Sequence, residues 1–260
     1  MLDTLYSLPE GLILAGAVLS IVGIMATLPL LVRRIPWMTP DDRNTDFVIR
    51  SQGTLFTMTS LVLTFTLVQA DINNRQADAM VSNEASRIEQ LDRLLARYGD
   101  PKVTEARVLL RNYATSLVND EWPVMLSDQR HAATTRAFSA LSRQLLAVNP
   151  ANERQNLVLA EILRALDSVA DLRSQRLNFV TTRLPSLYWW VVLLAVAMLL
   201  FVSSSIQQTG FRRTILCAQA AVVGGFLGFV FVMDQPFRGE SAITPEALTK
   251  VIERMAIRMD

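Results

Sequence analysis

The chain has 260 residues, of which 51% are hydrophobic and 19% are charged, and its formal net charge is +1. This apolar fraction argues against a purely water-soluble domain, and the near-neutral charge argues against an overall basic face for nucleic acid. The only histidine is His131 and the only cysteine is Cys217, so the sequence shows no metal-ligand spacing and no thiol chemistry. We therefore predict no catalytic residue, no metal site and no cofactor.

Four long apolar runs lie along the chain. Each is about 20 residues long, which at 1.5 Å per helical residue matches the roughly 30 Å hydrocarbon core of a bilayer. The N-terminus lacks a positively charged leader and a small-residue cleavage site, so we expect the first run to stay as an anchor. The predicted fold class is all-α: a polytopic membrane protein with four transmembrane helices and an extramembrane helical bundle formed by long extensions of the second and third spans. The spans are expected at about residues 10–32, 50–70, 184–206 and 213–233.

The second span carries a polar stripe. Its polar positions recur every seven residues and therefore share one face, with a drift of only about 20° per heptad. Such a stripe predicts a face that lines water, and the apolar side chains between its members would form a narrow constriction that gates by dewetting. The alternative is that the hydroxyls bond to their own helix or join neighbouring helices. The polar positions are Gln52, Thr59, Thr66 and Asn73, and the apolar positions are Met58, Leu61, Val62 and Phe65.

Residues 71–183 read as helix nearly throughout, between a first membrane hairpin at 1–70 and a second at 184–233. Apolar positions from Ile88 to Tyr98 recur every three to four residues, so one helix is expected to continue out of the second span. It should end at Gly99, and Pro101 should begin the next helix. A later apolar pattern continues without a strong breaker toward the third span, which we expect to be its continuation.

The string Glu121-Trp122-Pro123 marks a kink, because proline removes a backbone donor and clashes with the preceding helical turn. An aromatic ring and a carboxylate at a kink can bind a ligand. The alternative is structural: Trp122 anchors the bundle and Glu121 pairs with an arginine such as Arg107 or Arg111.

The fourth span ends in "VMDQPFRGES", which begins a C-terminal segment at 234–260. Asp234 marks the membrane boundary, Pro236 ends the helix, and Gly239 frees the chain to turn. Thr244 is expected to cap an amphipathic helix that docks on the helical domain or lies at the membrane surface. Phe237 with Arg238 is a candidate wedge that couples the helical domain to the second span.

The arginines of the short loops suggest how the protein is oriented in the membrane. The short loops carry Arg33, Arg34 and Arg43 after the first span, and Arg212 and Arg213 after the third. Short loops rich in arginine stay in the cytoplasm. We therefore expect both termini and the helical domain outside the cytoplasm.

Several strings between residues 53 and 248 resemble the bestrophin-like family of bacterial membrane proteins, also classed as domain of unknown function 4239. They are "NEASRIEQLDRLLARY", "RNYATSLVNDEWPVM", "RSQRLNFVTTRLPSLYW" and "VMDQPFRGESAITPEAL". The Glu-Trp-Pro and Asp-x-Pro-Phe-x-Gly pieces are the most specific of these matches.

The resemblance extends in layout to bestrophins, which are pentameric anion channels with the second membrane helix along the pore and a cytoplasmic helical extension. It implies a pentamer of this chain with the second span at its axis. Animal bestrophins also bind calcium through acidic residues after a Pro-Phe-Gly. Here Pro236 and Phe237 match, Arg238 is inserted, and only Glu240 remains of the acidic run. Since calcium requires six to eight oxygen ligands, no calcium clasp is predicted.

The predicted function is a homo-oligomeric ion channel of the bacterial inner membrane, with itself, the lipid bilayer and small ions as partners and no nucleic acid. The alternative is a non-conducting membrane scaffold or sensor whose helical domain binds a partner or ligand. A polar stripe that faces neighbouring helices of the same subunit would favour this alternative.

Overall fold

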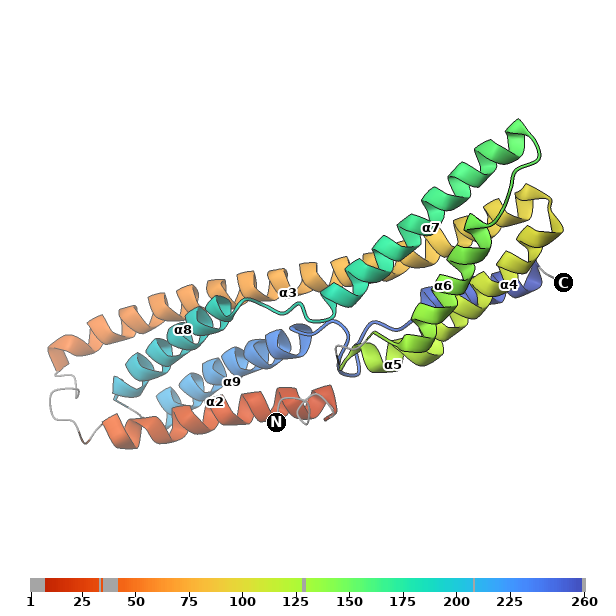
Figure 1. The fold of residues 1–260 in the computed structure, drawn as a ribbon. Helices are drawn as coiled ribbons and strands as arrows, with labels where there is room; N and C mark the ends of the chain where they lie inside the picture. Colours follow the sequence, from red (N-terminus) through yellow and green to blue (C-terminus); the bar gives the residue numbers. More distant parts are fainter. Residues whose placement is uncertain (1–7, 33, 35–41, 128–129, 208, 259–260) are drawn as a thin grey trace. The chain divides into compact units, whose positions relative to one another are not determined.

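A computed structural model describes residues 8–32, 34, 42–127, 130–207 and 209–258. Within them every regular element is helical and none is a strand (Figure 1). Four of the helices are long and apolar enough to cross a membrane. These observations confirm the predicted all-helical membrane fold. The contacts divide the chain into two units: Met1–Asn74 with Arg183–Ser241, here called the membrane unit, and Arg75–Thr182 with Ala242–Asp260, here called the helical unit.

The membrane unit packs its helices through small residues and aliphatic side chains. Helix α9 lies along α2, because Gly224 and Gly228 present bare backbone to Ala17 and Val18. A buried aliphatic core that includes Leu63 and Val192 joins α3 and α8 to this pair. The helices of the unit are α2 (Glu10–Val32), the first part of α3 (Asp42–Tyr98), α8 (Ser186–Ser205) and α9 (Gly210–Met233).

Helix α3 is continuous over 57 residues and contributes to both units. Its sequence contains no proline and only one glycine, Gly53, so nothing local interrupts the hydrogen-bond ladder. It ends where predicted: Gly99 adopts φ +78°, a left-handed conformation that suits glycine, and α4 begins at Pro101.

In the helical unit, ion pairs join α4, α7 and α10 to the second part of α3. Helix α4 contacts α6 and also α10, so the C-terminal helix docks on this unit, one of its two predicted positions. Helix α10 begins at Glu246, with Pro245 rather than Thr244 as its N-cap residue. The helices are α4 (Pro101–Ser116), a π-helical turn (Leu117–Glu121), α5 (Trp122–Met125), α6 (Ala132–Leu146), α7 (Glu153–Phe179) and α10 (Glu246–Ile257).

The connection into the third span differs from the expected continuous helix. Helix α7 ends at Phe179, and α8 begins only at Ser186, with Pro185 as its N-cap residue. Proline disfavours helical dihedrals at the residue before it, which is Leu184 here. The backbone N–H of Leu184 donates instead to Asp234 Oδ1 at 2.7 Å. Only the second span, therefore, extends as one helix into the helical unit.

Candidate functional site

One polar face of α3 is buried inside the membrane unit. Gln52 is 7% exposed, and its side-chain amide donates to Gln219 Oε1 of α9 at 2.8 Å. Thr59 is 1% exposed, and its hydroxyl donates to the carbonyl of Ala195 in α8 at 3.3 Å. Thr66 is also buried and donates to a carbonyl of its own helix. These three members of the predicted stripe therefore face helices of the same subunit.

Asn73, the fourth member of the stripe, is partly buried, and its Oδ1 accepts a hydrogen bond from Gln69 at 3.2 Å. The neighbouring Asn74 donates to the carbonyl of Met233 at 2.8 Å, which attaches α3 to the end of α9. Asn74 thus holds α3 against the fourth span, whereas the hydrogen bond of Asn73 stays within α3.

The opposite side of α3, here called the outer face, is exposed in the subunit. Met58, Leu61 and Phe65 are 57%, 50% and 65% exposed, whereas Val62 is partly buried. Threonine hydroxyls lie between these apolar side chains and donate to carbonyls four residues earlier in α3. The residues of the outer face are Thr54, Thr57, Met58, Leu61, Thr64, Phe65, Val68 and Ile72.

The predicted pore-lining residues thus divide between two faces of one helix. Gln52 hydrogen-bonds to α9, Thr59 to α8 and Thr66 to a carbonyl of α3 itself. The large apolar residues Met58, Leu61 and Phe65 lie on the outer face. Which of them contact a pore stays a prediction. The sequence identified the polar face but did not indicate that it turns inward.

The corner after α9 is closed by buried contacts. Asp234 is buried and accepts from the Leu184 backbone, so it joins the ends of α8 and α9. Phe237 is also buried, and Gly239 adopts φ +94°, which favours glycine. Pro236 lies between them and is buried as well. These buried contacts close the turn after α9, and the structural or coupling role of its residues stays a prediction.

A reciprocal clasp joins this corner to the start of α2. The backbone N–H of Glu10 donates to Glu240 Oε2 at 3.3 Å, so a carboxylate caps the positive end of α2. In return, the Glu10 carboxylate accepts from the Ser241 backbone N–H at 2.6 Å and from its hydroxyl at 2.7 Å. Glu240 therefore serves a helix terminus.

Four charged side chains form a buried cluster in the helical unit. Arg176 Nε lies 2.6 Å from Glu84 Oε2, and Arg176 Nη2 lies 3.0 Å from Glu121 Oε1. Arg173 forms a second ion pair with Glu121. Two positive and two negative charges balance, which lets them occupy a buried site. We name Glu84, Glu121, Arg173 and Arg176 the buried ion cluster.

The π-helical turn delivers Glu121 to this cluster. It occupies Leu117–Glu121 and is followed directly by Trp122 and Pro123, which begin α5. Proline has no N–H to donate, so the wider turn and the new helix accommodate it. The Arg176 guanidinium carbon lies 5.4 Å from the centre of the Trp122 ring, a cation–π contact.

Electrostatics favour the ionised form of Glu121. Burial alone raises the pKa of its carboxyl, but the hydrogen bonds and charges of Arg173 and Arg176 outweigh burial and hold the pKa below its usual range. Burial also raises the pKa of the Tyr113 phenol, whose oxygen has no hydrogen-bond partner among the described residues. The structural alternative, in which Glu121 pairs with an arginine, is confirmed, but the partners are Arg173 and Arg176. Of the two examples suggested from the sequence, Arg107 pairs with Asp92 instead.

A family model of the Bestrophin-like domain matches residues 18–248, which is most of the chain. This chain belongs to the bestrophin-like family. No curated protein matches it.

Solved structures agree with this bestrophin-like assignment in fold. A mutated bacterial bestrophin homolog from Klebsiella pneumoniae is similar with a TM-score of 0.69 and 11% identity, over 95% of this chain and 98% of that chain. Another crystal structure, of a membrane protein variant, has a TM-score of 0.68 and 12% identity, over 95% and 98%. At such low identity the likeness concerns the fold alone.

In this bestrophin-like chain, the described residues include no group of three or more His, Cys, Asp or Glu placed to hold a metal ion. His131 is the N-cap residue of α6 and makes no side-chain cap. Sequence reasoning missed Glu10, Arg173 and Arg176. The sequence marks these residues only by where their charges stand. Glu10 directly precedes an apolar run, and Arg173 and Arg176 occupy positions on the apolar face of α7.

Proposed function

We propose that this bestrophin-like protein assembles copies of itself around the membrane part of α3 and conducts ions along that helix. The observation that carries the proposal is the outer face of α3, a long exposed stripe on a helix whose other side is fully engaged within its subunit. Neighbouring copies that meet around an axis would cover the flanks of this stripe and leave its centre toward a pathway.

The chemistry of the outer face suits a gated pathway. Met58, Leu61 and Phe65 in each copy would form stacked apolar rings, which exclude water when narrow and admit it when slightly wider. Hydroxyls of Thr57 and Thr64 would supply polar positions between these rings. Gln52, Thr59 and Thr66 would then set the rotation of α3 without touching the ion.

The number of subunits and the kind of membrane are inferred from the family. A pentamer is inferred from the layout of bestrophins, and the bacterial inner membrane from the bacterial members of the family. The arginines of the short loops, such as Arg212 and Arg213, support a helical unit outside the cytoplasm, whereas the bestrophin layout supports the opposite.

Thiol labelling tests on which side of the membrane the helical unit lies. In a Cys217→Ser background, Ala151→Cys reports on the helical unit and Gln207→Cys on the short loop after α8, and both positions are exposed. A membrane-impermeant maleimide added to intact cells should label Ala151→Cys only. Labelling of Gln207→Cys alone would reverse the orientation.

Conduction is tested with purified full-length protein in planar bilayers. Unitary currents are expected, and Met58→Ala or Phe65→Ala should change their amplitude or open probability. Leu19→Ala on α2, which removes an exposed apolar side chain outside α3, should leave the amplitude unchanged. Silent bilayers in which inserted oligomers are demonstrated would rule out conduction.

The second candidate function is a non-conducting membrane scaffold or sensor. It is favoured by the inward direction of Gln52 and Thr59, whose hydrogen bonds join helices of one subunit. The buried ion cluster would then fix the shape of a partner-binding helical unit. Silent oligomers that bind a partner through the helical unit would support this function.

A further inference from the structure

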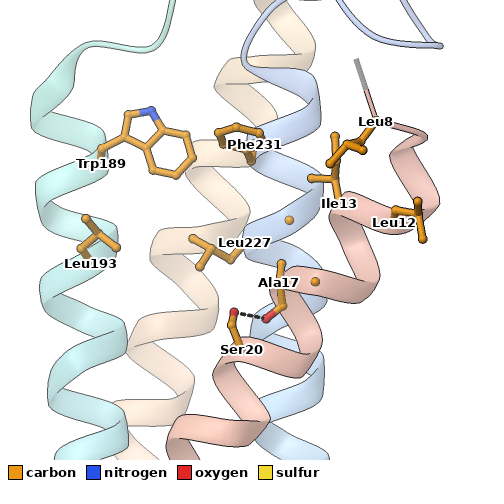
Figure 2. Close-up of a pocket in the computed structure, with 11 residues that line it drawn as sticks. Leu8, Leu12, Ile13, Ala17, Ser20, Trp189, Leu193, Leu227 and Phe231 are labelled. Carbon is orange, nitrogen blue, oxygen red and sulfur yellow. Dashed lines mark hydrogen bonds between the residues drawn. The ribbon is translucent and has the colours of Figure 1, made fainter. Parts of the chain in front are cut away.

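An apolar groove opens between α2, α8 and α9 of the membrane unit. Its volume is about 390 Å³, toward the small end of the roughly 300–1,000 Å³ typical of ligand pockets. Figure 2 shows Ala17 and Leu12 on α2, Leu193 on α8 and Leu227 on α9 along its walls.

Three small residues of α2, Gly16, Ala17 and Ser20, leave room in the α2 wall of the groove. Gly16 has open space beside it, since no heavy atom lies within 4 Å of where a Cβ would stand. Ser20 has the one hydroxyl among the described lining residues, and it donates to the Ala17 carbonyl at 2.8 Å, as the dashed line in Figure 2 marks. With that donor satisfied, the described lining offers little to water and fits an apolar occupant.

Aromatic rings close one end of the groove. Trp189 and Phe231 meet edge to face, with ring centroids 6.2 Å apart. Figure 2 shows Trp189, Phe231 and Leu8 in the upper part of the view, above Leu193 and Leu227, with Phe231 between the other two. Trp189 also stands near the start of α8, where an amphipathic ring lies at the level of lipid headgroups.

The position of the groove identifies its occupant. All three helices are candidate membrane spans, and only 11% of the apolar window of α2 is buried within the subunit, so this side has apolar surface that suits contact with hydrocarbon. None of the described lining residues comes from α3. In the proposed assembly around α3, the groove is therefore not part of the axis, and this choice of occupant rests on that assembly.

We infer that the groove binds one acyl chain of a membrane phospholipid, with Trp189 against the chain near its headgroup end. The site is distinct from the outer face of α3 and does not require ion conduction. Leucine at Gly16 would fill the space that the chain occupies. Gly23 is the matched control: it too lies exposed on α2 with no atom near its would-be Cβ, but it is not part of the lining.

The first test uses fluorescence. Full-length protein with Trp37→Phe, Trp122→Phe and Trp190→Phe keeps Trp189 as its only tryptophan. It is placed in phosphatidylcholine vesicles whose acyl chains are brominated, because bromine quenches tryptophan on contact. Quenching is expected, and Gly16→Leu should lose most of it while Gly23→Leu retains it. Unchanged quenching in Gly16→Leu would overturn the proposal, since Trp189 would then meet only bulk lipid.

A second measurement avoids the tryptophan replacements. Native mass spectrometry of the oligomer in mild detergent should show phospholipid retained by the unmodified chain and by Gly23→Leu, and lost in Gly16→Leu. Equal retention in the three proteins would contradict the acyl-chain site. A smaller oligomer for Gly16→Leu, with Trp189 unquenched in the parent, would assign the groove to a neighbouring copy instead.

Discussion

Arg176 and Glu84 form an ion pair in which neither side chain is exposed, although they lie 92 residues apart in the chain. The same guanidinium also reaches Glu121, and its remaining Nη1 donates toward the Met125 sulfur at 3.1 Å. Helices α3, α5, α7 and the π-helical turn are thus joined at one arginine.

Removal of this arginine should strongly destabilise the helical unit. Arg176→Leu leaves Glu84 buried without its partner, which costs about 3–5 kcal/mol. We expect the melting temperature of the full-length protein in detergent to fall on the order of 10 °C. Lys250→Ala, which breaks an exposed pair with Glu246, should leave it unchanged. Equal melting temperatures for Arg176→Leu and the parent would show that the pair contributes nothing to stability.

Acid should weaken the helical unit through Glu121. Its pKa in the folded protein lies below the unfolded value, so its stabilisation is present above the unfolded pKa and is lost as pH falls through the folded pKa. Burial raises the pKa of Glu84 despite the charge of Arg176, so Glu84 contributes in the opposite direction and does not account for acid loss. Melting curves of the parent should shift downward below about pH 4. Glu121→Gln should be less stable at neutral pH and show a smaller acid shift.

Alanine substitutions at two adjacent glycines of α9 should differ in their effect on stability, because only Gly224 lies tightly against α2. At Gly224, a Cβ would lie 2.9 Å from Val18 Cα and 3.0 Å from the Ala17 carbonyl oxygen, so Gly224→Ala must push the helices apart. A loss of about 1–3 kcal/mol is expected. Gly225→Ala meets only a side-chain atom at 3.9 Å and should be neutral or slightly stabilising through helix propensity. Thermal denaturation of both variants tests this contrast, which equal midpoints would refute.

The clasp between α2 and the corner should depend on Gly239. Its φ of +94° disfavours a side chain, and a Cβ there would lie 3.1 Å from Glu10 Oε1. Gly239→Ala should therefore loosen the clasp and speed hydrogen exchange at the Ser241 amide, measured by mass spectrometry in nanodiscs. Gly11→Ala, with no atom near the added methyl group, is the control. Slow exchange at Ser241 in Gly239→Ala would mean that the clasp tolerates the strain.

Accessibility should separate the two faces of α3. In a Cys217→Ser background, Met58→Cys on the outer face should react with a charged, water-soluble thiol reagent if that face lines water. Thr59→Cys, buried against α8, should react far more slowly. Similar unreactivity of both cysteines would place the outer face in lipid or protein and count against the pathway.

The sequence predicted those parts of the fold that depend on local chemistry. The apolar runs gave the spans, the absence of proline allowed α3 to continue, and Gly99 with Pro101 marked the end of α3 and the start of α4. The apolar pattern does not predict the break between α7 and α8, because its period continues to Val180 and carries no information on the backbone constraint that Pro185 places on Leu184.

The partners of the charged residues could not be predicted in the same way. Glu121 lies 52 and 55 residues from Arg173 and Arg176, and only tertiary packing of α7 against α3 and α5 brings them together. Similarly, a period of seven places Gln52 and Thr59 on one face but does not tell whether that face points to an axis or to α8 and α9. Both questions depend on how helices rotate relative to one another.

The clasp between Glu10 and Ser241 also constrains the order of assembly. Glu10 and its partners are separated by 230 and 231 residues, so the ribosome completes the first span long before the carboxylate that caps it exists. During synthesis the start of α2 must leave its backbone donors to water or headgroups, and the segment after α9 later replaces those partners. One of the last parts of the membrane unit to be made thus secures the first.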